Sequence, residues 1–209
     1  DGPNIYIKRD DQTGLALGGN KTRKLEFLLG DALARGCDTI ITGGAAQSNH
    51  CRQTAAAAAI CDLECHLMLG GDVPEQVSGN LLLDELLGAT VHFCGEDRKG
   101  QGIPALVTQL KAQGHNPFVI PYGGSNATGA MGYLAAFDEL LAQCTAQNLK
   151  VSKLVFASSS GGTHAGLLLA KLLCGSDIDI IGINIEKPES EGLPFAQQIV
   201  ELVKQSAAL

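Results

Sequence analysis

Short runs of β-branched and apolar residues alternate along the chain with longer segments of helical periodicity. Strands joined through a helix need a crossover connection, which makes neighbouring strands parallel and covers the sheet with helices. The pattern therefore predicts an α/β protein with parallel sheets flanked by helices. The predicted strands are NIYIKRDD, DTIITGG, ECHLMLGG, TVHFCG, PFVIPYGG, KLVFASSSGG and DIDIIGINIEK; the predicted helices cover 21–35, the alanine-rich stretch to 61, 79–87, 103–113, a long stretch after 128, 163–175 and the residues from 194.

Length and charge limit the classes of partner. The chain has 209 residues, of which 45% are hydrophobic, and a formal net charge of −7. This length can bury a core as one large domain or as two smaller ones that share a cleft. Nucleic-acid binding rests on a basic footprint, and the acidic balance without any Lys/Arg run argues against it. We expect small molecules, or a second copy of the chain, as partners.

Apolar runs and cysteines bear on the compartment. The longest strongly apolar run, 55–61, is far shorter than the roughly 20 residues that cross a bilayer, and no charged-then-apolar leader opens the sequence. We therefore expect no membrane partner and a cytoplasmic location. The seven cysteines are scattered through predicted helices and strands, which fits reduced thiols. No His/Cys pair of zinc-finger spacing follows Cys61 and Cys65, so we expect no metal site.

Four junctions before predicted helices are polar and rich in glycine: GGNK, TGGAAQSNH, YGGSNATG and SSSGGTH. In parallel sheets, ligands bind where the carboxyl ends of strands meet helix N-termini. SSSGGTH has the composition of a phosphate cup, because glycines allow close backbone approach while hydroxyls and helix N–H groups donate. The same residues could equally form a capped turn. No GxGxxG fingerprint occurs, which weakens a dinucleotide interpretation. The candidate phosphate-binding residues are Ser158, Ser159, Ser160, Gly161, Gly162 and Thr163.

The QSNH stretch places Ser48 and Asn49 at the start of the alanine-rich helix. Ser48 taken alone is best explained as an N-cap. In a functional interpretation, Asn49 donates a hydrogen bond to a ligand oxygen and Ser48 lies against a reacting carbon. His50 fits a helix surface or a core equally well, and we give it only a secondary role.

Lys21 decides the class of protein. GLALGGNKT is close to a nucleotide-binding P-loop, but that motif needs lysine directly after the last glycine, and Asn20 intervenes. A P-loop phosphotransferase stays the alternative, and it would bind Mg-nucleotide. A cation in the first turn of a helix is also unfavourable with the helix dipole. The position makes sense if the lysine is neutralised as an imine or lies near a bound phosphate, because desolvation and nearby positive charge release a nucleophilic amine.

Taken together and in this order, GGNKTRKLEF, TGGAAQSNHCRQTAA, IPYGGSNATGAMGY and ASSSGGTHAGL resemble the pyridoxal-phosphate enzymes of the D-cysteine desulfhydrase and 1-aminocyclopropane-1-carboxylate (ACC) deaminase family. The resemblance covers about residues 4–185. It implies a two-domain fold of the tryptophan synthase β type, known as fold type II, in a homodimer. By analogy, residues 1–24 and 131–209 form the larger, cofactor-binding domain and residues 25–130 the smaller, mobile one.

The resemblance also implies roles for individual residues. Lys21 matches the lysine that carries pyridoxal 5'-phosphate covalently, and Lys24 matches a neighbour of its phosphate. Asn49 matches the asparagine that bonds the ring 3-hydroxyl, and Ser48 the serine across the substrate from the lysine. Substrate-binding positions are Asn20, Gln47, Ser48 and His50, and Lys21 and Ser48 are the catalytic pair.

The chain departs from the family pattern in two respects. The family often has glycine where Ser159 stands, so serine would be strained there if the position required a positive φ. Family members also carry a further C-terminal segment and an earlier first strand region, so the resemblance implies truncation at both ends.

The substrate implied by the resemblance is a small amino acid. QSNH, where typical deaminases have QSNQ, favours D-cysteine desulfhydrase or a sulfonate-releasing relative that acts on cysteate. We rank the desulfhydrase first; it eliminates sulfide from D-cysteine and yields pyruvate and ammonia. ACC deaminase and L-cysteate sulfo-lyase are the alternatives. A catalytically silent fragment of such an enzyme is a further alternative.

Overall fold

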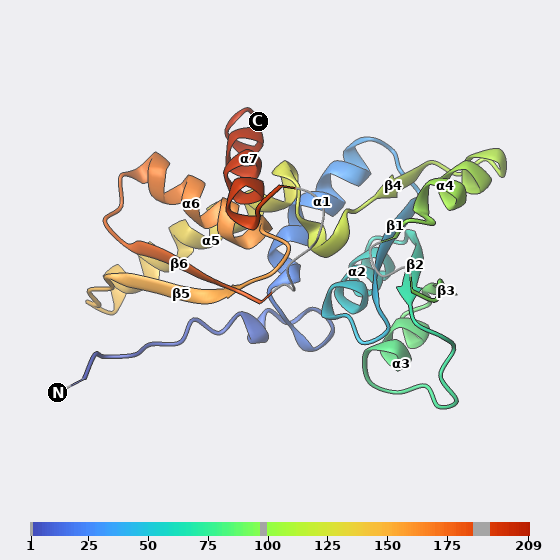
Figure 1. Cartoon of the computed structure of the whole chain (residues 1–209), viewed down its shortest axis with the longest axis horizontal. Coiled ribbons are helices and arrows are strands. Elements are labelled where there is room, and N and C mark those ends of the chain that lie inside the picture. The colour runs from blue at the N-terminus through green and yellow to red at the C-terminus, as the bar shows by residue number, and fades with distance from the viewer. Residues whose placement is uncertain (1, 97–99, 186–192) are drawn as a thin grey trace.

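The computed structural model describes residues 2–96, 100–185 and 193–209. Helices and strands alternate as predicted from β1 onward (Figure 1). The strands are β1 Thr39–Ala45, β2 Glu64–Gly70, β3 Thr90–Phe93, β4 Pro117–Val119, β5 Lys153–Ser158 and β6 Asp179–Asn184. The α-helices are α1 Lys21–Ala34, α2 Asn49–Ile60, α3 Gly79–Leu86, α4 Ile103–Ala112, α5 Ala127–Ala146, α6 Gly162–Cys174 and α7 Phe195–Ala207, and the short 3₁₀ turns are η1 Asp10–Gln12, η2 Leu15–Leu17 and η3 Tyr122–Gly124.

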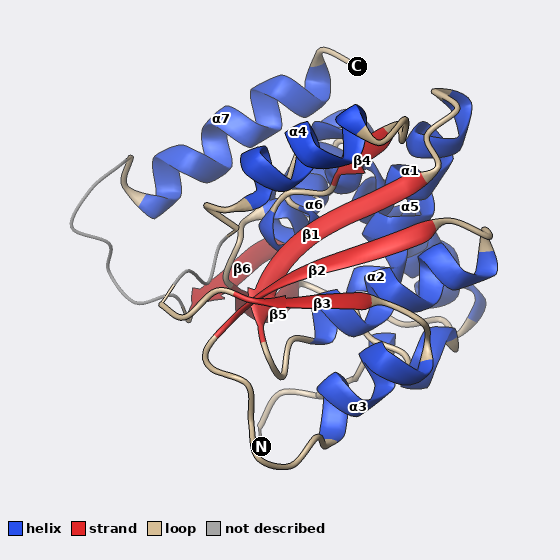
Figure 2. Cartoon of the chain, turned by 90° about the vertical axis from the view of Figure 1, so that its right-hand side faces the viewer, coloured by secondary structure: helices blue, strands red, loops and turns tan. Residues whose placement is uncertain are grey.

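The described strands form two parallel sheets. One has four strands in the order β3-β2-β1-β4, and the other pairs β5 with β6 (Figure 2). β1 is central in the larger sheet, and its two neighbouring isoleucines show why both faces need helices. Ile40 packs with leucines and alanines of α1 and α2, while Ile41 packs with α4, and both are 0% exposed. The expected parallel sheets flanked by helices are thus confirmed.

The predicted N-terminal strand is wrong. Residues 2–9 contain no strand, and Ile5 and Ile7 are 82% and 78% exposed. In Figure 1 this segment runs as an extended tail along the bottom of the molecule. A strand is stabilised by ladder hydrogen bonds to a neighbour, and within the described residues no strand pairs with this segment. The β-forming sequence is present without its partner.

Helix α1 lies between the two sheets and brings Lys21 to that position. It contacts α2 on the side of the larger sheet and α5 on the side of β5 and β6 (Figure 1). The predicted domain boundary after residue 24 falls within this continuous helix. The division into a larger and a smaller domain stays a prediction.

Two expectations about the chain as a whole have structural counterparts. All seven cysteines are free thiols. Throughout residues 2–96, 100–185 and 193–209, no helix has both the length and the apolar character to cross a membrane.

Candidate active site

Lys21 and Lys24 lie one turn apart at the start of α1 and share a hydrogen-bond acceptor. Lys21 Nζ lies 3.3 Å from Gly123 O, and Lys24 Nζ lies 3.1 Å from the same oxygen. Gly123 belongs to η3, in the YGGSNATG junction that follows β4. Two ammonium groups therefore meet at the carboxyl edge of the larger sheet.

Lys24 is the buried member of this pair, with only 1% of its surface exposed. Within the described part of the chain, no carboxylate lies within ion-pair distance of its ammonium. Burial, reinforced by the charge of Lys21, lowers the pKa of Lys24 well below the ordinary value. A buried cation without a counter-ion is costly. An anionic group bound here would remove that cost, so the local chemistry fits a phosphate.

Ser125 joins the lysines to the loop that follows β5. Its hydroxyl accepts from Lys24 Nζ at 3.1 Å and from the N–H of Gly162 at 3.1 Å. It donates to Ser160 Oγ at 2.7 Å. Gly162 is the first residue of α6, so the positive end of that helix faces the same point. The third N–H of Lys24 and the O–H of Ser160 have no described partner, and the Ser125 O–H and Gly162 N–H could exchange their present partners for an anion.

The glycines of SSSGGTH keep this cluster open. A Cβ added to Gly162 would lie 2.7 Å from Ser125 Oγ and 2.9 Å from Lys24 Nζ. Gly161 has a φ of 82°, a conformation that side chains rarely adopt. Ser159 is not among the described residues with positive φ, so the strain considered for serine at this position is absent. The left-handed turn falls two residues later, on a glycine.

The other two residues of the predicted phosphate cup face different partners. Ser158 is buried, and its hydroxyl lies 3.3 Å from His164 Nδ1. Thr163 lies near the Tyr133 hydroxyl, which donates to Asp10 at 2.9 Å. Ser160 and Gly162 are the cup residues that meet the lysines through Ser125.

The QSNH stretch forms the N-terminus of α2. Ser48 is its N-cap, and its hydroxyl accepts from Cys51 N at 3.2 Å, as the capping interpretation predicts. Asn49 is exposed at the first helical position, and its Oδ1 accepts from Asn80 Nδ2 at 3.0 Å. Gln47 is also held by Asn80, whose backbone N–H donates to Gln47 Oε1 at 2.9 Å.

Two residues of α2 attach this turn to the lysine segment. Gln53 accepts from the backbone N–H of Thr22 at 2.9 Å, and Arg52 donates to Gly18 O at 2.7 Å. Asn20, which precedes Lys21, has an exposed side chain, and its carbonyl oxygen lies 3.3 Å from the Tyr133 hydroxyl. The structure thus brings the QSNH stretch to the loop that carries Lys21.

His50 is buried rather than placed on a helix surface. Its Nε2 lies 2.9 Å from Thr42 Oγ1, and that hydroxyl donates to Ile120 O at 2.9 Å. Thr42 therefore accepts from His50, which puts the ring proton on Nε2. Nδ1 is buried without a described partner. Burial, with further contributions from the charges of Lys21 and Lys24, lowers the pKa of His50 well below its ordinary value, so the ring is neutral.

Sequence reasoning missed three residues of this network. Ser125 lies in YGGSNATG, a junction singled out for its composition although none of its residues was chosen. Arg52 is a buried charged residue in the alanine-rich helix α2. A charge within such an apolar stretch is unusual, and this could have drawn attention to it in the sequence. Asn80 carries no such signal, because its partners come from a segment about 30 residues away.

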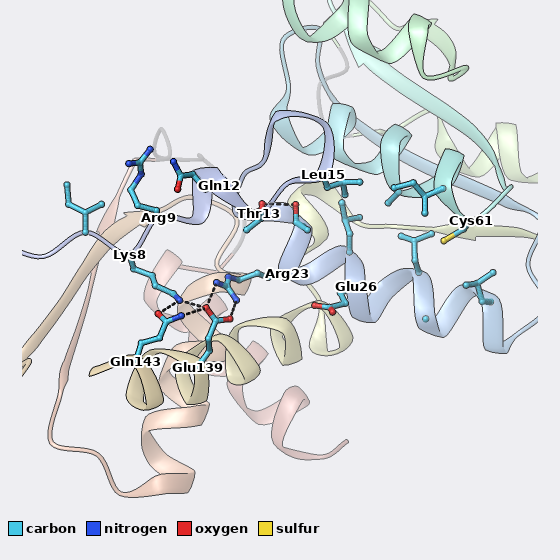
Figure 3. A pocket seen from close by; sticks show the side chains of 18 residues that line it. Lys8, Arg9, Gln12, Thr13, Leu15, Arg23, Glu26, Cys61, Glu139 and Gln143 are labelled. Atoms are coloured by element: carbon cyan, nitrogen blue, oxygen red, sulfur yellow. Dashed lines mark hydrogen bonds and ion pairs between the residues drawn. The ribbon is translucent and has the colours of Figure 1, made fainter. Parts of the chain in front are cut away.

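A separate cavity of about 910 Å³ lies along the opposite side of α1 (Figure 3). One end is polar, where Lys8 and Arg23 both bind Glu139 of α5. The other end is lined by apolar residues such as Leu29 of α1 and Cys61 after α2. Lys21, Lys24 and Ser125 are not part of its wall. The cavity and the lysine cluster are therefore different places in the structure. We take the lysine cluster as the candidate site, because Lys24 is buried there without a described counter-ion.

The sequence was compared with known families and structures. The model of the family described as pyridoxal-phosphate dependent enzyme matches residues 1–207. The chain belongs to this family. Its members depend on pyridoxal phosphate, which agrees with the cofactor expected from the four motifs and with the fit of the lysine cluster to a phosphate.

Individual relatives refine this assignment. The chain is 43% identical to a D-cysteine desulfhydrase of Serratia proteamaculans over 214 aligned residues, covering 100% of this chain and 65% of the relative. It is 41% identical to a putative 1-aminocyclopropane-1-carboxylate deaminase of Pyrococcus abyssi, covering 98% of this chain and 62% of the relative. A crystal structure of an ACC deaminase homologue matches with a TM-score of 0.87 and 39% identity, covering 97% of this chain and 61% of that one. The chain thus spans about 65% of the curated relatives' length, and the expected fold type II architecture is confirmed.

Proposed function

We propose that the protein is a pyridoxal-phosphate dependent lyase acting on a small amino acid, with D-cysteine as the first candidate. The observation that carries the proposal is Lys24, a buried lysine without a described counter-ion, one turn after Lys21 and beside Ser125. Lys24, Ser125, Ser160 and the N–H of Gly162 would hold the phosphate, Lys21 would bind the cofactor covalently, and Asn49 would face the ring 3-oxygen. When bound, the cofactor supplies an electron sink for a carbanion next to the substrate amine.

The residues of the chain then have distinct tasks. The Lys21 amine would be the base that removes the proton from the substrate Cα. Lys24 lies one turn along α1 and shares the Gly123 carbonyl oxygen with Lys21. Ser48 and Gln47 would border the substrate, and the neutral ring of His50, held by Thr42, would support them from the buried side of α2. The overall reaction would convert D-cysteine and one water to pyruvate, sulfide and ammonia.

ACC deaminase is the second candidate, supported by the Pyrococcus abyssi relative and by the ACC deaminase homologue structure. L-cysteate sulfo-lyase is the third. QSNH supports D-cysteine over ACC, because typical deaminases have QSNQ. A silent fragment is the remaining alternative, since the chain spans about 65% of its curated relatives.

A spectroscopic experiment tests the proposal. The purified protein is loaded with pyridoxal phosphate, its visible spectrum is recorded, and the adduct is fixed with borohydride and mapped. A pyridoxyl group on Lys21 is expected, and its absence contradicts the proposal. D-cysteine, ACC and L-cysteate are then offered separately: sulfide with pyruvate supports the first candidate, 2-oxobutanoate the second, sulfite the third, and an adduct without turnover the silent fragment.

We also propose that the protein works in the cytoplasm as a homodimer. The free cysteines support a reducing compartment, and the family resemblance supports the dimer. Light scattering coupled to size exclusion measures the mass directly, and a mass near the monomer's 21.7 kDa contradicts the dimer.

A further inference from the structure

Arg52 is a buried arginine whose hydrogen bonds to the described residues all go to oxygens of uncharged groups. It is 7% exposed on the first turns of α2. One guanidinium nitrogen donates to Asn49 Oδ1 at 3.1 Å and to Asn80 Oδ1 at 2.7 Å. The other terminal nitrogen donates to Gly18 O at 2.7 Å. A single side chain therefore joins the QSNH stretch, helix α3 and the loop that carries Lys21.

This contact fixes which way two amides point. A guanidinium has donors and no acceptor, so each amide that meets it must turn its oxygen toward it. Asn80 then turns its nitrogen the other way, where it donates to Gln47 O at 2.8 Å and to Asn49 Oδ1 at 3.0 Å. Asn49 Oδ1 thus accepts from both Arg52 and Asn80. The reversed amide would face two donors with another donor, which leaves groups unsatisfied.

What remains exposed on Asn49 is a donor. Its Nδ2 has no partner among the described residues, and the side chain is exposed. We propose that Arg52, acting with Asn80, is a positioning residue that locks the Asn49 amide so that its NH₂ group is presented to an oxygen of the bound ligand. This rests on the proposed function, under which that oxygen is the 3-oxygen of pyridoxal phosphate.

Asp84 is the nearby carboxylate that could compete for the Arg52 guanidinium, but it forms no hydrogen bond with it in the described structure. It lies one turn after Asn80 on α3, fully buried, and neither of its carboxylate oxygens is bonded in the described structure. A bidentate pair with this carboxylate would take two N–H groups away from the amides. Instead the charge of Arg52 acts on Asp84 without a hydrogen bond, and the four terminal N–H groups can serve Asn49, Asn80 and Gly18.

The test compares two ligands that differ at one atom. Apo protein is titrated with pyridoxal phosphate and with its 3-deoxy analogue, and the dissociation constants are read from the visible spectrum. Wild type prefers the cofactor with the oxygen. Arg52→Gln, whose amide has both donor and acceptor, is expected to reduce that preference roughly tenfold, the scale of one hydrogen bond to a charged acceptor. Arg52→Lys keeps a donors-only group and is expected to restore most of it.

Controls separate positioning from folding. Arg35→Gln is the matched substitution at a surface arginine and is expected to leave the preference unchanged. Urea unfolding checks each variant; if Arg52→Gln does not fold, Asn80→Asp replaces the donor facing Asn49 Oδ1 by a carboxylate and is expected to lower the same preference. A folded Arg52→Gln or Asn80→Asp variant with wild-type preference, alongside a wild-type Lys21 adduct, overturns the positioning role alone. A wild type without a Lys21 adduct overturns the proposed function and this inference with it.

Discussion

The hydroxyl of Ser125 lies 2.7 Å from that of Ser160, which joins the loop after β4 to the loop after β5. The two loops belong to different sheets, and α1 delivers Lys24 to the same point at 3.1 Å from Ser125. A ligand held by this cluster would therefore contact both sheets at once. Changes in cofactor affinity should therefore report on changes in the contact between these two loops.

Replacing Ser125 by alanine should weaken binding of pyridoxal phosphate about tenfold, because one hydrogen-bonding hydroxyl toward an anion contributes roughly 1.5–3 kcal/mol. The change also leaves Lys24 Nζ with one partner fewer. Titration of the apo protein followed by visible absorbance measures the effect. Ser152→Ala, at an exposed serine, is the matched control; equal affinities in the two variants would exclude Ser125 from the phosphate site.

Gly162→Ala should block the cluster sterically. The added Cβ would lie 2.7 Å from Ser125 Oγ and 2.9 Å from Lys24 Nζ, so the groups that face the anion must move apart. We expect a loss of cofactor affinity of tenfold or more with a smaller change in stability. Gly30→Ala is the helical control, since nothing lies within 4 Å of its added Cβ, and it should stabilise the protein by about 1 kcal/mol. Unchanged affinity in Gly162→Ala would place the anion elsewhere.

The sequence predicted the larger part of the fold because parallel strands and amphipathic helices carry local periodicities. It failed at residues 4–11, where the strand-forming sequence is present but a strand needs a partner that local sequence cannot supply. Lys21 could be singled out because a lysine in the first turn conflicts with the helix dipole, whereas Lys24 follows only from the family resemblance.

The remainder of the site depends on contacts between distant segments. Ser125 reaches Ser160 across 35 positions, and Asn80 reaches Asn49 across 31. Neither pairing has a periodicity that a single sequence reveals. His50 is likewise neutral because it is buried. The sequence could not show this, because the motif fits a surface histidine as well as a buried one.

Asp84→Asn should make the protein more stable at alkaline pH. Burial raises the pKa of Asp84 from 3.8 to about 7, against the opposing charge of Arg52. Between these values the folded state binds a proton that the unfolded state lacks, so this contribution is complete below 3.8 and is lost as pH rises through 7. Relative to wild type, the variant should gain roughly 1–4 kcal/mol between pH 4 and pH 9. Urea unfolding across that range measures it; a gain equal to that of the exposed control Asp177→Asn would contradict the buried charge.

Lys24→Met should change how the stability of the apo protein depends on pH. Burial, aided by the charge of Lys21, lowers the pKa of Lys24 in the folded state. Below the ordinary pKa of lysine, about 10.4, the unfolded chain binds a proton that the folded chain resists, so wild type loses stability as pH falls toward the depressed folded pKa. Methionine keeps the length of the side chain and removes the titration. The variant should therefore gain stability over wild type as pH falls from 10.

Inorganic phosphate distinguishes an anion site from mere burial of the amine. An anion that binds the folded state alone stabilises it by mass action, and Lys24 provides the charge that attracts it. Millimolar phosphate should therefore raise the urea unfolding midpoint of wild type at pH 7. The midpoint of Lys24→Met should hardly move, so the difference between the two midpoints should become smaller. Exposed Lys111→Met provides the matched control and should respond to phosphate as wild type does. Equal responses of wild type and Lys24→Met would mean that Lys24 holds no anion.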